Sequence, residues 1–170
     1  MDLIALATQR LERVKVLCTQ SGLQYAELAP TFMSAGVAVG FSQTDYVILS
    51  VIGGGNGNED HLLITSGILN AIKQDRLVAL EAANYFTSTR TAYPVYLHDA
   101  PIGWALLMQQ AFPIALLQDA PWFFDKFCVR ALPQVISEYR STIVERWDLG
   151  GRPWEWTAED RDALLLRSGL

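Results

Sequence analysis

The sequence lacks any long hydrophobic run. None of its segments approaches the roughly 18 consecutive apolar residues that a candidate membrane-spanning helix needs. The apolar stretch at residues 3–7 is too short to form the core of a signal peptide, and charged residues begin soon after it at Arg10 and Glu12. We therefore expect a soluble, cytoplasmic protein that has no membrane partner.

Cysteine is also scarce. Cys18 and Cys128 are the only two cysteines, which is too few for a disulfide framework. Both fall on the apolar side of expected helices, and neither has sequence neighbours of the kind that activate a thiol. We expect two reduced, buried thiols.

Charge of either sign is sparse, and no basic cluster is present. Lys and Arg number 13 against 18 Asp and Glu, which gives a net charge of −5 and a pI of about 4.9. Binding to phosphates needs a concentrated basic face, so we expect no nucleic-acid partner. With 51% hydrophobic and 18% charged residues, the composition is that of an ordinary globular domain. A chain of this length buries roughly 70% of its unfolded surface and needs no disulfide or metal to fold.

The chain also lacks a phosphate-binding motif, although residues 53–58 are rich in glycine. A dinucleotide fingerprint needs a glycine at the sixth place, where Asn58 stands. A P-loop ends in Gly-Lys-Ser/Thr, whereas this segment runs on into Glu59 and Asp60, whose charges would repel phosphate. The segment therefore predicts a hairpin loop between two strands.

No metal site or catalytic set stands out. Glu59, Asp60 and His61 are adjacent, and successive strand side chains point to opposite faces, so the three cannot converge on one ion. His98 and Asp99 are not accompanied by a Gly-x-Ser-x-Gly nucleophile elbow. We expect no metal, no cofactor and no enzyme, although catalytic sites can also assemble from residues that are distant in the sequence.

Periodicity predicts one helix followed by four strands. Apolar residues spaced by three and four, including Leu11 and Val14, predict an amphipathic helix over residues 2–21. Its apolar face is narrow, so Leu11 and Val14 could contact a partner as well as the core. Strands are expected at residues 23–28, 31–41, 46–52 and 61–69. Because no βαβ rhythm appears, they predict an antiparallel meander.

A helix, two strands and a second helix are expected next. The helix at residues 76–90 carries Asn84 on its expected apolar stripe, where the amide should bind nearby backbone or contact a ligand. Alternation predicts strands at residues 94–98 and 102–109. A last helix opens at Pro121 with a predicted buried stripe, and Pro133 predicts a bend or break near Leu132. The stripe comprises Phe124, Phe127, Cys128, Ala131, Val135 and Tyr139.

The chain changes character at residue 147. Trp147, Trp154 and Trp156 fall within ten residues, and Thr157 could then begin a short helix. We expect one α+β domain at residues 1–146 and a C-terminal appendage at residues 147–170. Exposed aromatic residues are enriched at binding hot spots. The tryptophans therefore either pack on the domain itself, for which the small-residue face of the 31–41 strand offers a place, or contact a partner.

Several segments suggest a family. Residues 80–86 (Leu-Glu-Ala-Ala-Asn-Tyr-Phe), 93–97 (Tyr-Pro-Val-Tyr-Leu) and 103–107 (Gly-Trp-Ala-Leu-Leu) are followed by a helix that opens at Pro121. This pattern resembles the type III secretion chaperone-like fold and, within it, the YbjN-like, Tir-chaperone-related domains of bacteria. The likeness covers roughly residues 1–146 and matches Asn84 to an Asn of the family. The glycine-rich loop and the tryptophan tail depart from the pattern, and the tail could cover the usual binding surface.

The resemblance implies a non-enzymatic module that binds a protein segment, assists secretion or signalling, and often forms a homodimer. It implies no catalytic residue. On this hypothesis Trp147, Trp154, Trp156, Leu11 and Val14 are the candidate interface residues. The alternative is a small-molecule sensor or an enzyme with a pocket between sheet and helices. The candidate lining residues for that pocket are Asn84, Trp104, Tyr96 and His98.

Overall fold

The chain folds as an α+β unit in the order that the sequence predicts. The computed structural model describes residues 3–28, 35–52, 60–100, 103–155 and 157. In chain order its elements are α1 (Leu3–Gln20), β1 (Ala26–Glu27), β2 (Ala35–Gly40), β3 (Tyr46–Ile52), β4 (His61–Ile72), α2 (Arg76–Thr89), β5 (Val95–Asp99), β6 (Trp104–Pro113), α3 (Ile114–Asp119), α4 (Pro121–Phe123), the π-helix η2 (Phe124–Arg130) and α5 (Leu132–Arg146).

The six strands form one antiparallel sheet in the order β1-β2-β3-β4-β6-β5. The first four strands are the expected meander. The hairpin at the glycine-rich segment is confirmed by the pairing of Ile52 with His61, while the loop itself lies outside the described residues. After α2, strand β6 returns beside β4, and β5 becomes the outer strand. The fold class, an antiparallel sheet flanked by helices, is confirmed.

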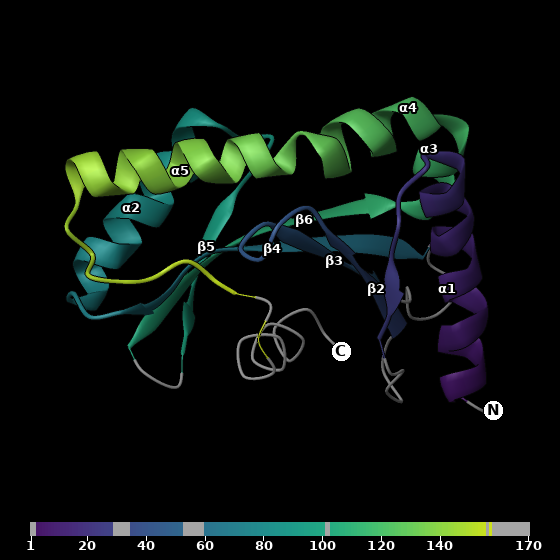
Figure 1. Ribbon diagram of the computed structural model, residues 1–170, viewed down its shortest axis with the longest axis horizontal. Helices are drawn as coiled ribbons and strands as arrows, with labels where there is room; N and C mark the ends of the chain where they lie inside the picture. Colours follow the sequence, from purple (N-terminus) through teal and green to yellow (C-terminus); the bar gives the residue numbers. More distant parts are fainter. Residues whose placement is uncertain (1–2, 29–34, 53–59, 101–102, 156, 158–170) are drawn as a thin grey trace.

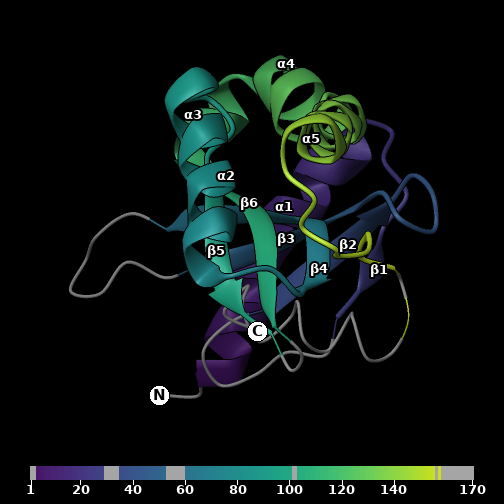
Figure 2. The ribbon, with the colours of Figure 1, turned by 90° about the vertical axis from the view of Figure 1, so that its left-hand side faces the viewer.

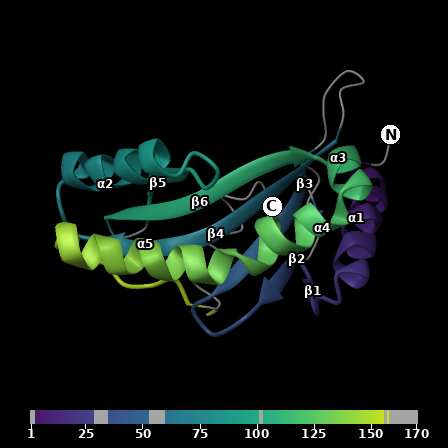
Figure 3. The same ribbon diagram turned by 90° about the horizontal axis from the view of Figure 1, so that it is seen from above.

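The helices gather on one face of the sheet (Figures 1 and 2). Seen from above, α5 runs along the sheet beside α2, and α1 lies across the other end (Figure 3). Alternate strand residues such as Leu49, Ile64 and Leu106 point to this side and are fully buried in the main core. The opposite face carries a smaller buried cluster, which comprises Tyr46, Ile48, Ala105, Leu107 and Trp154. The alternation predicted for β6 is therefore confirmed.

Helix α2 presents a different face to the core from the one predicted. Its buried residues are Ala79, Ala82, Ala83 and Phe86, whereas Leu77 is 71% exposed and Asn84 is also exposed. The prediction that Asn84 lies on a buried stripe is wrong. The buried face thus combines three alanines with Phe86, whose ring stacks on Tyr139 of α5 at 4.2 Å between centroids. Asp75 caps the helix by accepting a hydrogen bond from the Leu77 N–H at 2.7 Å.

Several boundaries differ from the prediction. Strand β4 continues to Ile72 through register shifts after Gly67 and Leu69, and β6 continues to Pro113. The expected first strand is only two residues long. No element was predicted at residues 114–119, where helix α3 follows directly from β6. Irregular pairing interrupts the alternation on which a strand prediction depends.

The described part of the tail packs on the domain. Trp147 lies against Tyr85 at 5.4 Å between ring centroids, on the helix side of the sheet. Farther on, the Asn70 N–H donates to the Arg152 carbonyl at 2.7 Å, and the Arg152 N–H donates to the Asn70 carbonyl at 2.9 Å. The tail thus passes the end of β4 and reaches the other face of the sheet (Figure 1).

Trp154 is fully buried on that other face, and its indole N–H donates to the Leu69 carbonyl at 2.9 Å. Trp154 packs on Gly67 of β4 and not on β2. The prediction that the 31–41 strand offers the packing site is therefore wrong for Trp154. A Cβ atom at Gly67 would stand 2.3 Å from Cγ of Trp154. The absence of a side chain at Gly67 therefore creates the space for the indole ring.

Candidate functional site

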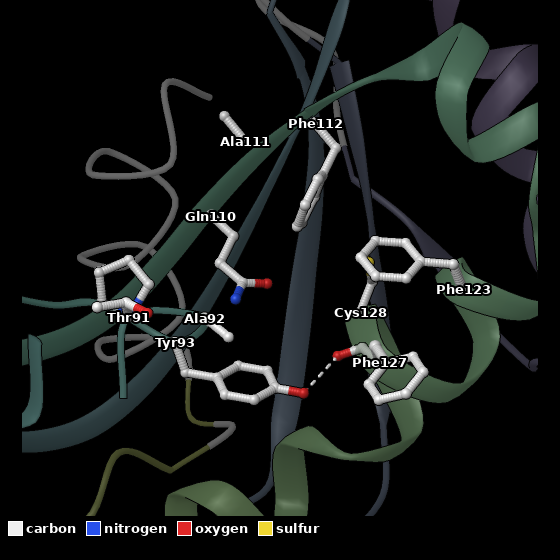
Figure 4. A pocket seen from close by; sticks show the side chains of 10 residues that line it. Thr91, Ala92, Tyr93, Gln110, Ala111, Phe112, Phe123, Phe127 and Cys128 are labelled. Atoms are coloured by element: carbon white, nitrogen blue, oxygen red, sulfur yellow. Dashed lines mark hydrogen bonds between the residues drawn. The ribbon is translucent and has the colours of Figure 1, made fainter. Parts of the chain in front are cut away.

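A cavity of about 330 Å³ opens at the edge of the main core, where β6, the turn after α2 and η2 meet (Figure 4). β6 contributes residues 110–112, the turn contributes residues 91–94, and α4 and η2 contribute Phe123, Phe127 and Cys128. Six side chains define it: Tyr93, Gln110, Phe112, Phe123, Phe127 and Cys128.

The π-helix sets the geometry of the helical wall. Pro133 has no N–H, so it cannot donate to the carbonyl of Val129 four residues earlier. The preceding turn is wound more widely, and the Ala131 N–H donates to the Lys126 carbonyl five residues back at 3.0 Å. Helix α5 begins at Leu132, which confirms the predicted break. π-Helical turns occur frequently at functional sites.

The wider turn moves Phe127 out of the core. An ideal α-helix places Phe127 on the buried stripe with Phe124 and Cys128, but its side chain is 47% exposed while those two are fully buried. The prediction for Phe127 is therefore wrong. An extra residue in a turn rotates the following side chains around the helix axis. The prediction assumed a period of 3.6 residues throughout and so did not include this rotation.

Four aromatic rings form a continuous cluster beside the cavity. Trp122 is 60% exposed and lies 6.1 Å from Phe127, measured between ring centroids. Phe123 lies 5.6 Å from Phe127 and 5.4 Å from Phe112. We call Phe112, Trp122, Phe123 and Phe127 the aromatic surface.

Two tyrosines hold the turn after α2 against the helices. The Tyr93 hydroxyl donates to the Phe127 carbonyl at 3.1 Å, and the Tyr139 hydroxyl donates to the Tyr93 carbonyl at 3.0 Å. Burial raises the pKa of both phenols, that of Tyr139 to about 12, so both remain donors at neutral pH. These two hydrogen bonds connect the turn before β5 to η2 and to α5.

The cavity wall carries no formal charge. No Asp, Glu, Lys, Arg or His is among the described residues that line it. Burial raises the pKa of the Cys128 thiol to about 12, so the thiol is protonated at neutral pH and is a poor nucleophile. The wall's buried polar side chain is Gln110, which is 8% exposed. Its Oε1 atom accepts no hydrogen bond from the described residues.

The structure places most of the predicted interface residues inside the protein. Leu11 and Val14 of α1 are 3% and 0% exposed in the main core, Trp154 is fully buried, and Trp147 is half-buried. Trp156 lies outside the described residues. Leu11, Val14 and Trp154 therefore offer no exposed apolar side chain in this arrangement, whereas part of the Trp147 ring remains exposed.

The predicted pocket residues are not brought together. Trp104 packs against the main core beneath Arg76, whose guanidinium lies 5.7 Å from the ring centroid. Tyr96 and His98 pair with Leu107 and Ala105 across the β5–β6 ladder and so belong to the opposite face of the sheet. Asn84 is exposed on α2.

Sequence reasoning did not identify Gln110, Tyr93 or Trp122. Two signals were present. Three aromatic residues follow Pro121 in succession, which is more than one buried helix face can hold, and a glutamine pair at residues 109–110 interrupts an otherwise apolar strand. Which member of that pair faces the core depends on the register of β6 against β4.

Within the described residues, no group of three or more His, Cys, Asp or Glu side chains is placed to hold a metal ion. The helices in these ranges are also too short or too polar for any to cross a membrane. No protein-family model matches the chain, and neither a curated protein nor a solved structure shows significant similarity.

Proposed function

We propose that this protein is a non-enzymatic binding module that holds an apolar segment of a protein partner on its aromatic surface. One observation supports the proposal above the others: Trp122 and Phe127, at 60% and 47% exposure, adjoin a ready-made cavity. Large exposed apolar patches mark interaction sites, and tryptophan is enriched among the residues that dominate binding energy.

The proposal keeps the chaperone-like role that the family resemblance implies but moves its location. Binding along the first helix was one expectation, but Leu11 and Val14 of α1, the residues named for it, are occupied by the core. The aromatic surface instead lies on α4, η2 and the end of β6, where Phe112 stands. A role in secretion or signalling and a homodimer remain parts of the proposal.

A permanently unfolded polypeptide tests the proposal. A reduced and carboxymethylated model protein that carries a fluorescent label is titrated with the full chain, and binding is followed by anisotropy. The double variant Trp122→Ser/Phe127→Ser should weaken binding at least about tenfold, because hot-spot side chains each contribute roughly 2 kcal/mol or more.

The matched control removes apolar side chains that are even more exposed, on other parts of the surface. Leu77 and Val144 are 71% and 81% exposed on α2 and α5. The double variant Leu77→Ser/Val144→Ser should bind as the original chain does. Equal loss in both double variants, or no binding by the original chain, would contradict the proposal. Light scattering over a concentration series tests the homodimer. If the original chain forms a dimer that Trp122→Ser/Phe127→Ser dissociates and the control variant does not, the partner is a second copy of the chain.

A further inference from the structure

Gln110 is a polar residue at a position where β6 otherwise places apolar side chains. Leu106 and Met108 precede it on the helix-facing side of the strand and are fully buried. Gln110 pairs with Ile64 of β4, which is also fully buried. A buried acceptor without a donor destabilises a fold. The core alone therefore gives no reason for a glutamine here.

The cavity supplies a reason. The carboxamide of Gln110 extends into the space between Phe112, Cys128 and Tyr93 (Figure 4). The last torsion of a glutamine side chain is soft, so a small rotation can turn Oε1 toward a donor that enters this space. The cavity thus presents the buried Oε1 acceptor of Gln110 in a lining that, apart from the Thr91 and Tyr93 hydroxyls, is mainly apolar.

Size and charge narrow the choice of ligand. Sites for small molecules range from about 300 to 1,000 Å³, and this cavity, at about 330 Å³, lies at the small end. An uncharged wall leaves an ionic ligand without a partner and makes its desolvation costly. The rings of Tyr93, Phe112 and Phe123 favour an aromatic ligand, because aromatic pairs gain edge-to-face and offset contacts.

From this geometry we infer that the cavity binds a neutral aromatic ring that carries one N–H or O–H donor, as indole and phenol do. The ring lies among Tyr93, Phe112 and Phe123, and its donor binds Oε1 of Gln110. This chemistry can come from a free small molecule or from a Trp or Tyr side chain of a bound protein segment. The inference does not require the proposed function, since a free ring can bind without any partner protein.

A pair of matched ligands tests the hydrogen bond. Indole and 1-methylindole differ in the N–H donor, and calorimetric titration of the full chain measures both affinities. Indole should bind about tenfold more tightly, because a buried hydrogen bond contributes on the order of one decade in affinity. In Gln110→Met, which keeps the length of the side chain but removes the acceptor, the two ligands should bind equally.

Gln109 provides the control on the same strand. It lies on the opposite face of the sheet, with Nε2 3.4 Å from Oγ1 of Thr65. Gln109→Met should retain the preference for indole. Thermal unfolding checks that both variants fold, and Gln110→Met should melt above the original chain, because it removes the unpaired acceptor.

The outcomes separate the inference from its rivals. Equal affinities of the original chain for indole and 1-methylindole, or no binding of either, would overturn it, even where polypeptide binding to the aromatic surface persists. N-acetyl-tryptophanamide distinguishes the two sources. Binding as tight as that of indole indicates a side chain of a partner, whereas rejection of this amide indicates a free small molecule.

Discussion

At the scale of single residues, Arg140 joins three parts of the chain that are far apart in sequence. Its guanidinium donates to the Ile68 and Gly67 carbonyls of β4 at 3.0 and 3.2 Å and to the Thr44 carbonyl at 2.9 Å. It also forms an ion pair with Asp45 at 2.8 Å, although its side chain is only 16% exposed. Arg140 thereby holds α5 onto the irregular part of β4 and onto the turn between β2 and β3.

Replacing Arg140 should therefore be costly. Arg140→Met leaves buried carbonyls and a carboxylate unpaired, and we expect a loss of about 2–4 kcal/mol in the free energy of unfolding, measured by urea denaturation. Arg130→Met is the control, because Arg130 is 50% exposed and pairs with Asp125 at the surface. It should cost less than about 1 kcal/mol. Similar losses in both variants would refute the role of Arg140.

At the scale of elements, the tail and β4 depend on each other. Gly67 has no side chain, and Trp154 fills the resulting space while donating to Leu69. The tail is thus part of the folded unit at least as far as Trp154. Trp147 and Trp154 pack on the domain, and Trp154 covers the smaller buried cluster on the face of the sheet opposite the described helices.

A double-mutant cycle measures this dependence. Trp154→Ala should cost about 3–5 kcal/mol, as large-to-small changes in a core do. Gly67→Ala should also destabilise the original chain, because the added methyl group would overlap the indole. In the Trp154→Ala background the same substitution should be neutral or stabilising by roughly 0.5 kcal/mol, since alanine is better than glycine within a strand. Additive effects in urea denaturation would contradict the packing.

At the scale of the whole molecule, the buried thiols and phenols link stability to alkaline pH. Burial raises the pKa values of Cys18 and Cys128 from 9.0 to about 12 and that of Tyr139 from 10.0 to about 12. Above pH 9 the unfolded chain releases thiol protons that the folded chain keeps. Raising the pH therefore favours the unfolded state, and the stabilising contribution is complete only below pH 9.

The expected slope is large enough to measure. Each thiol should lower the free energy of unfolding by about 1.4 kcal/mol for every pH unit above 9, while the folded thiol stays protonated. Urea denaturation between pH 7 and pH 10.5, under reducing conditions, gives the slope. The double variant Cys18→Ala/Cys128→Ala should show a flatter alkaline limb. An unchanged limb in that variant would show that the thiols titrate normally in the folded chain.

Local patterns in the sequence were sufficient for the order of elements. The alternation in β6 and the spacing of apolar residues in α1 each reflect a repeat within one element, so they predict its type and its buried face. Pro133 likewise predicts a break in its helix whatever the helix packs against, because proline has no N–H to donate. All three interpretations are confirmed, that of α1 by the burial of Leu11, Val14 and Cys18.

Long-range packing decided what those patterns could not determine. Packing on the core buried the alanine face of α2 and left Asn84 exposed. The π-helix before Pro133, which departs from the period of 3.6 within one segment, turned Phe127 outward.

The sequence by itself thus determined an α+β chain with an antiparallel sheet and buried thiols, because periodicity and composition act within each element. Only the tertiary structure decided the candidate site. The register of β6 turns Gln110 inward, the π-helix exposes Phe127, and Gly67 receives Trp154 from 87 residues away in the chain. The first and the last depend on contact between segments whose spacing in the sequence carries no periodic signal, and the π-helix departs from the period of 3.6 that a sequence prediction assumes.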